Sequence, residues 1–243
     1  MSTFVLTNPT ILLGGVDLTA KSNSISLTYE VETRDSTTFG SGGTRTNVGG
    51  LWTVAAEVGG FVDDTLVGAS IFDAVGGGPT VFQVTPTGVD GETGYAVKSI
   101  AVSQQPLGGS TGDIAADTLS LSGRSGSPLV RGTILHPSGT ARTATGNGTA
   151  RQVGAVLTGE KVYGALNVVA ASGTTPTLDV VVESASDEAF TSPTSRLTFA
   201  QTATVVGEWK ELAGPVTDTW WRVVYTLGGT TPSFKFGVTV GVR

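Results

Sequence analysis

The chain of 243 residues contains no cysteine and only one histidine, His136. The lack of cysteine excludes disulfides and thiolate metal sites. A single histidine without clustered partners does not make a zinc site, which takes about four ligands. No segment approaches the roughly 18–20 apolar residues of a membrane span. The first fifteen residues lack a basic region and a long apolar run, so we expect no signal peptide and synthesis in a cytosol.

Charged residues are also scarce, at 14% of the chain. Glycine is abundant at 35 residues, threonine, valine and serine are frequent, and apolar residues make up 39%. This composition is typical of many short strands joined by turns and not of disorder. The sequence therefore predicts an all-β fold with at most one short helix.

The acidic residues are concentrated in the first half of the chain. Residues 1–125 carry 12 acidic and 5 basic side chains, a balance of −7, whereas residues 126–243 have a balance of +1. A protein that grips nucleic acid needs a basic surface, and the first half has the opposite. An acidic wall could still line a passage for DNA because it repels phosphates. The alternative is that the mild acidity serves solubility only.

Residues 23–61 show the clearest pattern, two strands with alternating polarity. Their apolar positions are Ile25, Leu27, Tyr29 and Val31, then Trp52, Val54, Ala56 and Val58. A period of two places these side chains on one buried face. Glu30, Glu32 and Glu57 fall on the other face, which we predict to be free and acidic.

A long glycine-rich loop, Ser36–Gly50, separates these two strands and shows no packing pattern. Hairpins usually close within a few residues, and long loops on rigid sheets commonly contact other molecules. We therefore expect this loop to become ordered on contact with another subunit. The residues predicted to make that contact are Thr37, Thr38, Phe39, Gly40, Ser41, Gly42, Gly43, Thr44, Arg45, Thr46, Asn47 and Val48.

The rest of the chain divides into a first β domain, 1–130, a linker, 131–153, and a second β-sandwich or jelly-roll domain, 154–243. The predicted helix starts at Asp63 or Asp64, ends at Val75 and is stopped by Gly76. Further strands are expected at Thr10–Leu13, Thr80–Thr85, Tyr95–Ser103, Thr118–Ser122, Leu129–Leu135, Tyr163–Ala170, Thr177–Glu183, Arg196–Phe199, Trp220–Leu227 and Ser233–Val242.

No segment indicates catalysis or a cofactor. The segment Gly108–Gly112 matches the nucleophile-elbow pattern G-x-S-x-G, but no helix follows it and no histidine is near in sequence. Asp187 and Glu188 lack the surrounding oxygen ligands of a calcium loop. We interpret these segments as turns and expect no enzyme, no metal and no cofactor. Trp220 and Trp221 are adjacent on a strand, so one indole should enter the core and the other face a surface or interface.

Several of these segments occur together in a known family. Asp17-Leu18, the strand ending Tyr29–Glu32, Asp35–Gly40, Thr44-Arg45, Gly50-Leu51, Glu57-Val58, Asp64–Leu66, Gln105–Gly109 and Gly112-Asp113 follow one another in the order and spacing of that family. Over residues 10–125 the chain resembles the major tail (tail tube) proteins of long non-contractile-tailed bacteriophages. It departs from their pattern at Gly59–Phe61, where a more acidic and aromatic strand end is expected.

The resemblance implies a structural virion protein of the tail, made in the bacterial host cytoplasm. Copies would form stacked rings, normally of six subunits, with an acidic lumen containing Glu30, Glu32 and Glu57. The loop would reach an adjacent ring, and the second domain would lie outside the tube. Implied partners are further copies of the chain, the tape-measure protein, and the tail terminator and distal tail proteins. DNA would transit the lumen without specific binding, and no membrane is involved.

Two alternatives remain open on the sequence. A capsid decoration or other virion surface protein is built from similar β modules but forms trimers or isolated knobs. A carbohydrate-binding module would use Trp220 or Trp221 as its platform.

Overall fold

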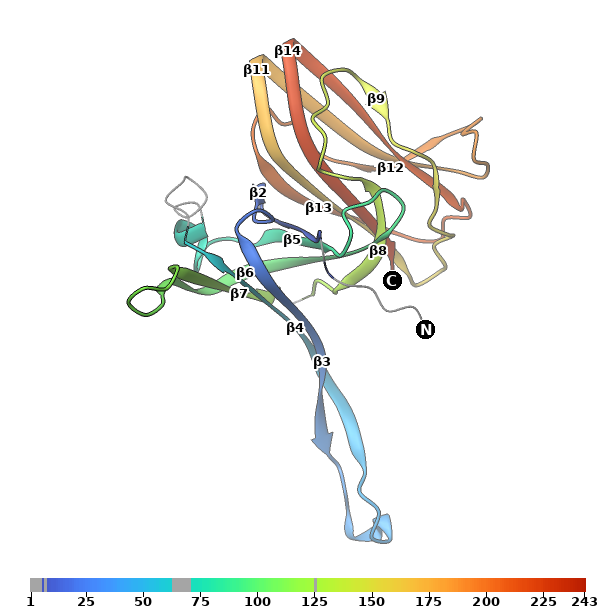
Figure 1. The fold of residues 1–243 in the computed structure, drawn as a ribbon. Coiled ribbons are helices and arrows are strands. Elements are labelled where there is room, and N and C mark those ends of the chain that lie inside the picture. The colour runs from blue at the N-terminus through green and yellow to red at the C-terminus, as the bar shows by residue number, and fades with distance from the viewer. Residues whose placement is uncertain (1–5, 7, 63–70, 125) are drawn as a thin grey trace.

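The computed structural model describes residues 6, 8–62, 71–124 and 126–243, and within these ranges the protein is almost entirely β. Its strands belong to one 14-stranded sheet that folds over on itself (Figure 1). This confirms the all-β prediction. The strands are β1 (Thr10–Leu13), β2 (Val16–Asp17), β3 (Ser22–Asp35), β4 (Asn47–Phe61), β5 (Thr80–Thr85), β6 (Thr93–Gly108), β7 (Ala116–Gly123), β8 (Val130–His136), β9 (Gly146–Asn147), β10 (Arg151–Gln152), β11 (Lys161–Ala185), β12 (Thr194–Thr198), β13 (Val206–Ala213) and β14 (Trp220–Val242).

The first half is built around four antiparallel strands in the order β3-β4-β7-β6, which we call the inner sheet. Its apolar face covers β1 and β5, and the two layers enclose the first core. That core contains Ile11, Leu13, Leu18, Val54, Ala56, Val58, Ile71, Phe82, Val84, Val97, Ala101, Leu119 and Leu121. The period-two pattern of the sequence thus determines which face of the inner sheet is buried.

The predicted helix is only partly within the described residues. Its start, at Asp63 or Asp64, lies outside them, whereas residues 71–74 are helical. Ile71 is buried in the first core, and Gly76 follows with a φ of 74°, as expected for a helix-ending glycine. Val75 bridges to Ala101, which places this segment beside β6.

The second half is a sandwich made mainly from two very long strands. β11 and β14 pair along almost their whole length, where the sequence predicted four shorter strands. Both bend at the same level, where Gly173, Thr175, Gly229 and Thr231 have positive φ angles. The bend folds the two halves of the ribbon against each other around Leu166, Val180, Phe234, Phe236 and other buried residues. β13 was not predicted from the sequence, because its apolar and charged residues do not alternate regularly.

The segment 131–153, predicted as a linker, is built into the fold. β8 pairs with β6 on one side and β14 on the other, and thereby joins the two halves in one sheet. β9 and β10 also pair with β14. Leu135 and His136 are almost fully buried. The strands that pair with this segment are far away in sequence, which is why composition indicated a linker here beyond the strand expected at Leu129–Leu135.

A buried polar network also joins the halves. The Gln83 side-chain amide donates to Thr239 Oγ1 at 2.6 Å, and Asn167 Nδ2 donates to Gln83 Oε1 at 3.3 Å. The backbone N–H of Gly15 donates to Asn167 Oδ1 at 3.1 Å. Nearby, a Cβ on Gly207 would lie 2.7 Å from the Gly14 Cα, so only glycine allows this approach. The halves are held by hydrogen bonds and tight packing.

Candidate functional site: a polar sheet face with two free edges

The outward face of the inner sheet carries rows of small polar and acidic side chains. One row runs Ser26, Glu57, Ser120 and Ser103, each paired with the next across adjacent strands. The stretches 26–30, 53–57, 118–122 and 103–105 that form this face contain no lysine or arginine. Over these stretches the face is therefore hydroxyl-rich and acidic, and has no cation to hold a phosphate.

Two of the three carboxylates predicted to share a face, Glu30 and Glu57, do so. Ser26 faces Glu57 and Thr53 faces Glu30, so Glu30 and Glu57 project from the same side. Glu32 lies two residues beyond Glu30 on β3, and all three side chains are exposed. Glu32 pairs with Arg34 at 2.6 Å, which partly neutralises it; within the described residues Glu30 and Glu57 make no ion pair. Whether this face lines a lumen stays a prediction.

The inner sheet ends in two free edges. β3 pairs only with β4 in the described part of the chain. On its side away from β7, β6 pairs with β5 as far as Ser99, and Ala101 bridges to Val75. Beyond that point, residues 102–108 have no strand partner on this side within the described residues. The four strands alternate in direction, so the two edge strands run in opposite directions. No sequence pattern predicts the β6 edge, because strand order is a tertiary property.

The predicted contact loop is shorter than expected, and its sides are paired. Asp35 faces Asn47 and Arg34 faces Val48, so Asn47 and Val48 belong to β4 and not to a loop. β3 and β4 continue past the body as a two-stranded arm (Figure 1). The tip contains a 3-10 turn, η1 (Phe39–Ser41), and the Phe39 side chain is fully exposed.

Hydrogen bonds within the tip of the arm organise it. Thr46 N donates to Thr37 Oγ1 at 3.0 Å, and Arg45 Nε donates to Asp35 Oδ2 at 3.0 Å. The bonds from Thr37 and Arg45 lower the pKa of Asp35. The arm therefore has a defined shape without a partner, where the sequence predicted ordering only on contact.

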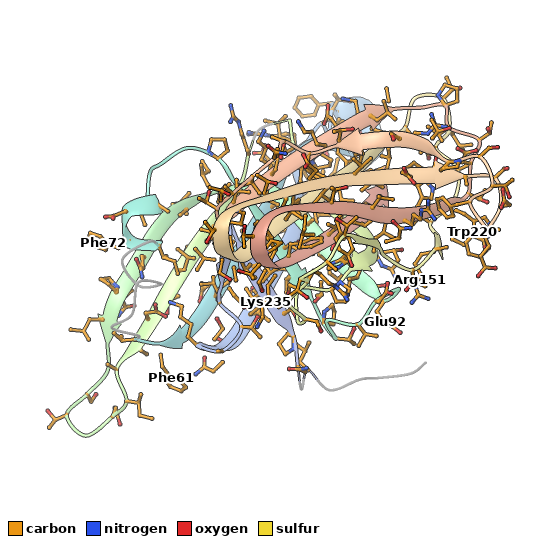
Figure 2. The ribbon with its side chains drawn as sticks, turned by 90° about the horizontal axis from the view of Figure 1, so that it is seen from above. Phe61, Phe72, Glu92, Arg151, Trp220 and Lys235 are labelled. Carbon is orange, nitrogen blue, oxygen red and sulfur yellow. The ribbon has the colours of Figure 1, made fainter. Side chains whose placement is uncertain are left out.

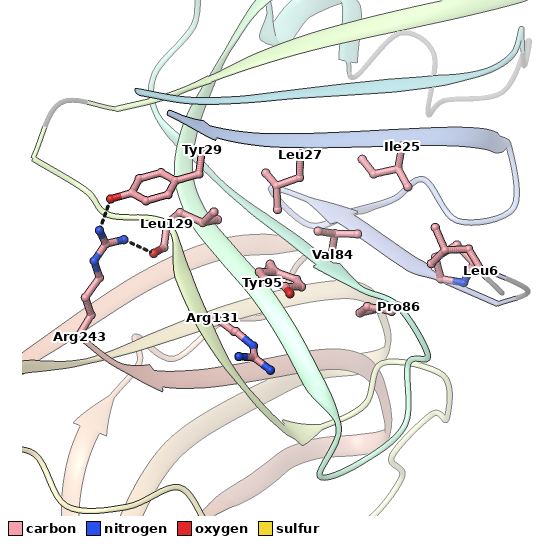
Figure 3. Close-up of a pocket in the computed structure, with 11 residues that line it drawn as sticks. Leu6, Ile25, Leu27, Tyr29, Val84, Pro86, Tyr95, Leu129, Arg131 and Arg243 are labelled. Atoms are coloured by element: carbon pink, nitrogen blue, oxygen red, sulfur yellow. Dashed lines mark hydrogen bonds between the residues drawn. The ribbon is translucent and has the colours of Figure 1, made fainter. Parts of the chain in front are cut away.

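An apolar groove of about 590 Å³ opens at the base of the arm, on the core side of β3. Figure 3 shows Ile25, Leu27 and Tyr29 along one wall, with Arg243 bonded to Tyr29 and Leu129. The lining residues are Leu6, Pro9, Ile25, Leu27, Tyr29, Val84, Pro86, Tyr95, Leu129, Arg131 and Arg243.

Trp220 and Trp221 point to opposite sides of β14, as adjacent residues of a strand do. Trp221 is completely buried in the second core, and its indole donates to the Gly154 carbonyl at 2.9 Å. Trp221 is therefore the indole that enters the core, which leaves Trp220 as the candidate for a surface or interface role. Trp220 is half-buried at the far end of the second half (Figure 2).

The remaining chemical candidates have structural roles. The segment Gly108–Gly112 belongs to the turn between β6 and β7, where Ser110 N donates to Asp113 Oδ2 at 3.2 Å. Within the described ranges, no three His, Asp or Glu side chains gather as a metal site requires. Nor does any helix described there have the length and apolar character needed to cross a membrane.

His136 lies in the segment predicted as a linker but is buried and stacked on Phe236, with ring centres 4.0 Å apart. Arg142 Nε donates to its Nε2 at 3.0 Å, so Nε2 is the acceptor and Nδ1–H donates to the Phe236 carbonyl. Burial lowers the pKa of His136 to about 4. The ring is thus a neutral structural group with both nitrogens occupied.

No protein-family model matches the chain, and no curated protein does so either. Solved structures resemble it at low TM-scores. A chain from the virion of a native gene transfer agent particle is 21% identical, with a TM-score of 0.38, over 49% of this chain and 94% of that one. A chain from the tail of an empty particle of that type, with C6 symmetry, is 19% identical, with a TM-score of 0.38 and the same coverage.

A third structure covers nearly the whole chain. The Dit protein of phage SPP1, described as a hub of the adsorption apparatus, is 12% identical, with a TM-score of 0.39, over 97% of this chain and 99% of that one. The phage-tail resemblance indicated by the sequence is thus found again among structural neighbours. With TM-scores below 0.5, these structures say nothing about the role of this chain. The role proposed below depends on the geometry of the inner sheet.

Proposed function

We propose that this chain is the subunit of a phage tail tube. Copies join edge to edge through their inner sheets into rings, and the rings stack into a tube whose lumen is lined by the polar, acidic face. The observation that carries the proposal is the inner sheet itself, with one polar face, one buried face and two free edges that run in opposite directions.

The directions of the edges favour a closed ring. Rotation about an axis leaves each strand pointing the same way along that axis. β3 of one copy therefore meets β6 of the next as an antiparallel pair, which continues the alternation within the sheet. Closing a barrel removes free edges, which would otherwise pair without control. Six copies per ring is the number implied by the family resemblance.

The position of the second half supports an outer location. The inner sheet covers β1 and β5, and Val81 and Ala96 next to this layer pack against Ala165 and Trp209 of the second half. The second half thus lies on the side of the inner sheet away from the acidic face. If that face lines the bore, the second half decorates the outside of the tube.

An acidic, hydroxyl-rich wall suits a passage for DNA because it repels phosphates. Arg34, the exposed cation beside its carboxylates, is paired with Glu32. The arm projects beyond the body, and we propose that it contacts the neighbouring ring in the stack. The tape-measure protein, the tail terminator and the distal tail proteins are the partners that this role requires.

Negative-stain electron microscopy of the concentrated full-length protein tests the proposal. Hollow striated tubes or stacked rings are the expected result. Trimers, isolated knobs or monomers at every concentration would contradict a tube and favour a virion surface protein.

A further inference from the structure

The groove at the base of the arm and the segment 71–75 lie at opposite lateral ends of the inner sheet. The groove opens beside β3, one edge strand, and the segment 71–75 lies along the free side of β6, the other edge strand. Both are on the core side of the sheet. Ile71 is buried in the first core, and Ile25 and Leu27 pack against that same core.

The two surfaces complement each other in chemistry. The groove is apolar on most of its wall, and Arg131 and Arg243 lie at the end away from Leu6 (Figure 3). Phe72 is 60% exposed and projects from its helix (Figure 2). The neighbouring Asp73 is exposed as well. Within the described residues, neither Asp73 nor Arg131 makes an ion pair.

Edge-to-edge pairing would bring these surfaces together. When β6 of one copy lies beside β3 of the next, the segment 71–75 of the first copy lies over the core side of the second copy's β3. That is where the groove opens. We propose that Phe72 of one copy fills the groove of the next copy and that Asp73 pairs there with Arg131. The inference rests on the proposed ring. It identifies a contact that stabilises the ring in addition to the pairing of β3 with β6.

This contact would explain two exposed features with one interaction. A phenylalanine that is mostly in water is unfavourable in an isolated subunit, and so is an apolar groove of this size. Each copy offers both surfaces once, at opposite ends, as a head-to-tail interface requires.

Cross-linking tests the contact, since the chain has no natural cysteine. Two full-length single-cysteine variants, Phe72→Cys and Leu27→Cys, are mixed and treated with a short bismaleimide. We expect a cross-linked heterodimer as the main product. Leu157→Cys, at an exposed position of the second half, replaces Phe72→Cys in the control mixture and should give none.

The possible outcomes test the contact between Phe72 and the groove independently of the proposed tube. Rings or tubes without the heterodimer would overturn the contact and leave the tube role standing. A heterodimer without rings or tubes would support the contact and contradict the tube role. Absence of both would overturn both, and cross-links of Phe72→Cys with itself would overturn the contact in favour of a two-fold interface.

A charge swap tests the ion pair. Asp73→Arg and Arg131→Asp should each raise the concentration needed for ring or tube formation by about tenfold. The double variant should recover most of this loss. A double variant no better than the worse single variant would overturn the Asp73–Arg131 pairing. Phe72→Ser should weaken assembly at unchanged unfolding temperature, and Leu157→Ser serves as its exposed apolar control.

Discussion

The guanidinium carbon of Arg243 lies 4.9 Å from the centre of the Tyr29 ring and 5.7 Å from that of Trp52. Arg243 also donates to the Tyr29 hydroxyl, and its other terminal nitrogen donates to the Leu129 carbonyl at 2.6 Å. Arg243 directly follows β14, the last strand of the second half, whereas the rings of Tyr29 and Trp52 lie 6.0 Å apart on β3 and β4 at the base of the arm. The second half thus holds the base of an arm that belongs to the first.

Replacing this residue should loosen the arm. We expect Arg243→Ala to remove a partly exposed cation–π contact worth about 0.5–1 kcal/mol and to speed amide hydrogen exchange in β3 and β4 around Tyr29. Lys235→Ala is the control, because Lys235 is an exposed cation of β14 that lies outside the groove. Equal exchange rates in wild type and Arg243→Ala would show that strand pairing alone fixes the base of the arm.

Shortening the tip of the arm separates folding from stacking. Deletion of Gly40–Gly43 removes the turn but leaves the pairing of Asp35 with Asn47 and of the residues behind them. We expect a folded protein with an unchanged unfolding temperature that forms no tubes. Circular dichroism and electron microscopy measure the two properties, and normal tubes from this variant would contradict the role of the arm in stacking.

Reversing charge on the polar face tests the lumen. Glu30→Lys combined with Glu32→Lys leaves both free edges intact, so we expect tubes to assemble. Cations on the wall would hold phosphates and slow DNA release. Release kinetics and infectivity of particles carrying the double variant are the measurement, with Glu188→Lys on the second half as control. Unchanged infectivity would argue against a lumen position for these residues.

The buried histidine makes stability depend on pH. The folded pKa of His136, about 4, lies below the ordinary 6.5 of an unfolded chain. Its contribution is therefore fully present above pH 6.5 and is lost as pH falls toward 4, by roughly 3 kcal/mol.

The variant His136→Gln keeps a donor and an acceptor but cannot take up a proton. We expect the difference in unfolding free energy between wild type and this variant to decrease as the pH is lowered from 7 to 4. Denaturant titrations at several pH values measure it. A difference that stays constant over this range would mean that His136 can be protonated in the folded protein.

The polar network at the junction should be costly to break. Gln83→Ala leaves the Asn167 amide and the Thr239 hydroxyl without their partner in a buried site, so we expect a loss of about 1–3 kcal/mol. Chemical unfolding monitored by tryptophan fluorescence measures this loss. Thr87→Ala, at a turn after β5, is the matched control. A loss no larger than that of the control would indicate that water replaces Gln83 in the network.

Local sequence patterns are enough to predict the fold class and the two faces of the inner sheet. Alternation at Ile25–Val31 and Trp52–Val58 is a local property, because successive side chains of a strand point to opposite sides. The ends of β1 and β5 and the glycine stop at Gly76 follow from equally local signals. The acidic face and the inward orientation of one of the two adjacent tryptophans could therefore be predicted.

Tertiary structure decided how the strands meet. The free β6 edge exists because β5 begins only at Thr80, opposite Ser99, and leaves the residues after Ser99 without this partner. His136 is buried because β8 lies between β6 and β14. The arm closes between Asp35 and Asn47 because cross-strand hydrogen bonds continue through glycine-rich sequence that has no apolar pattern. The groove likewise forms from β3, β5, β6, β8 and the end of β14, which are far apart in the chain. Pairings of this kind depend on which distant segments become neighbours, and no local pattern encodes that.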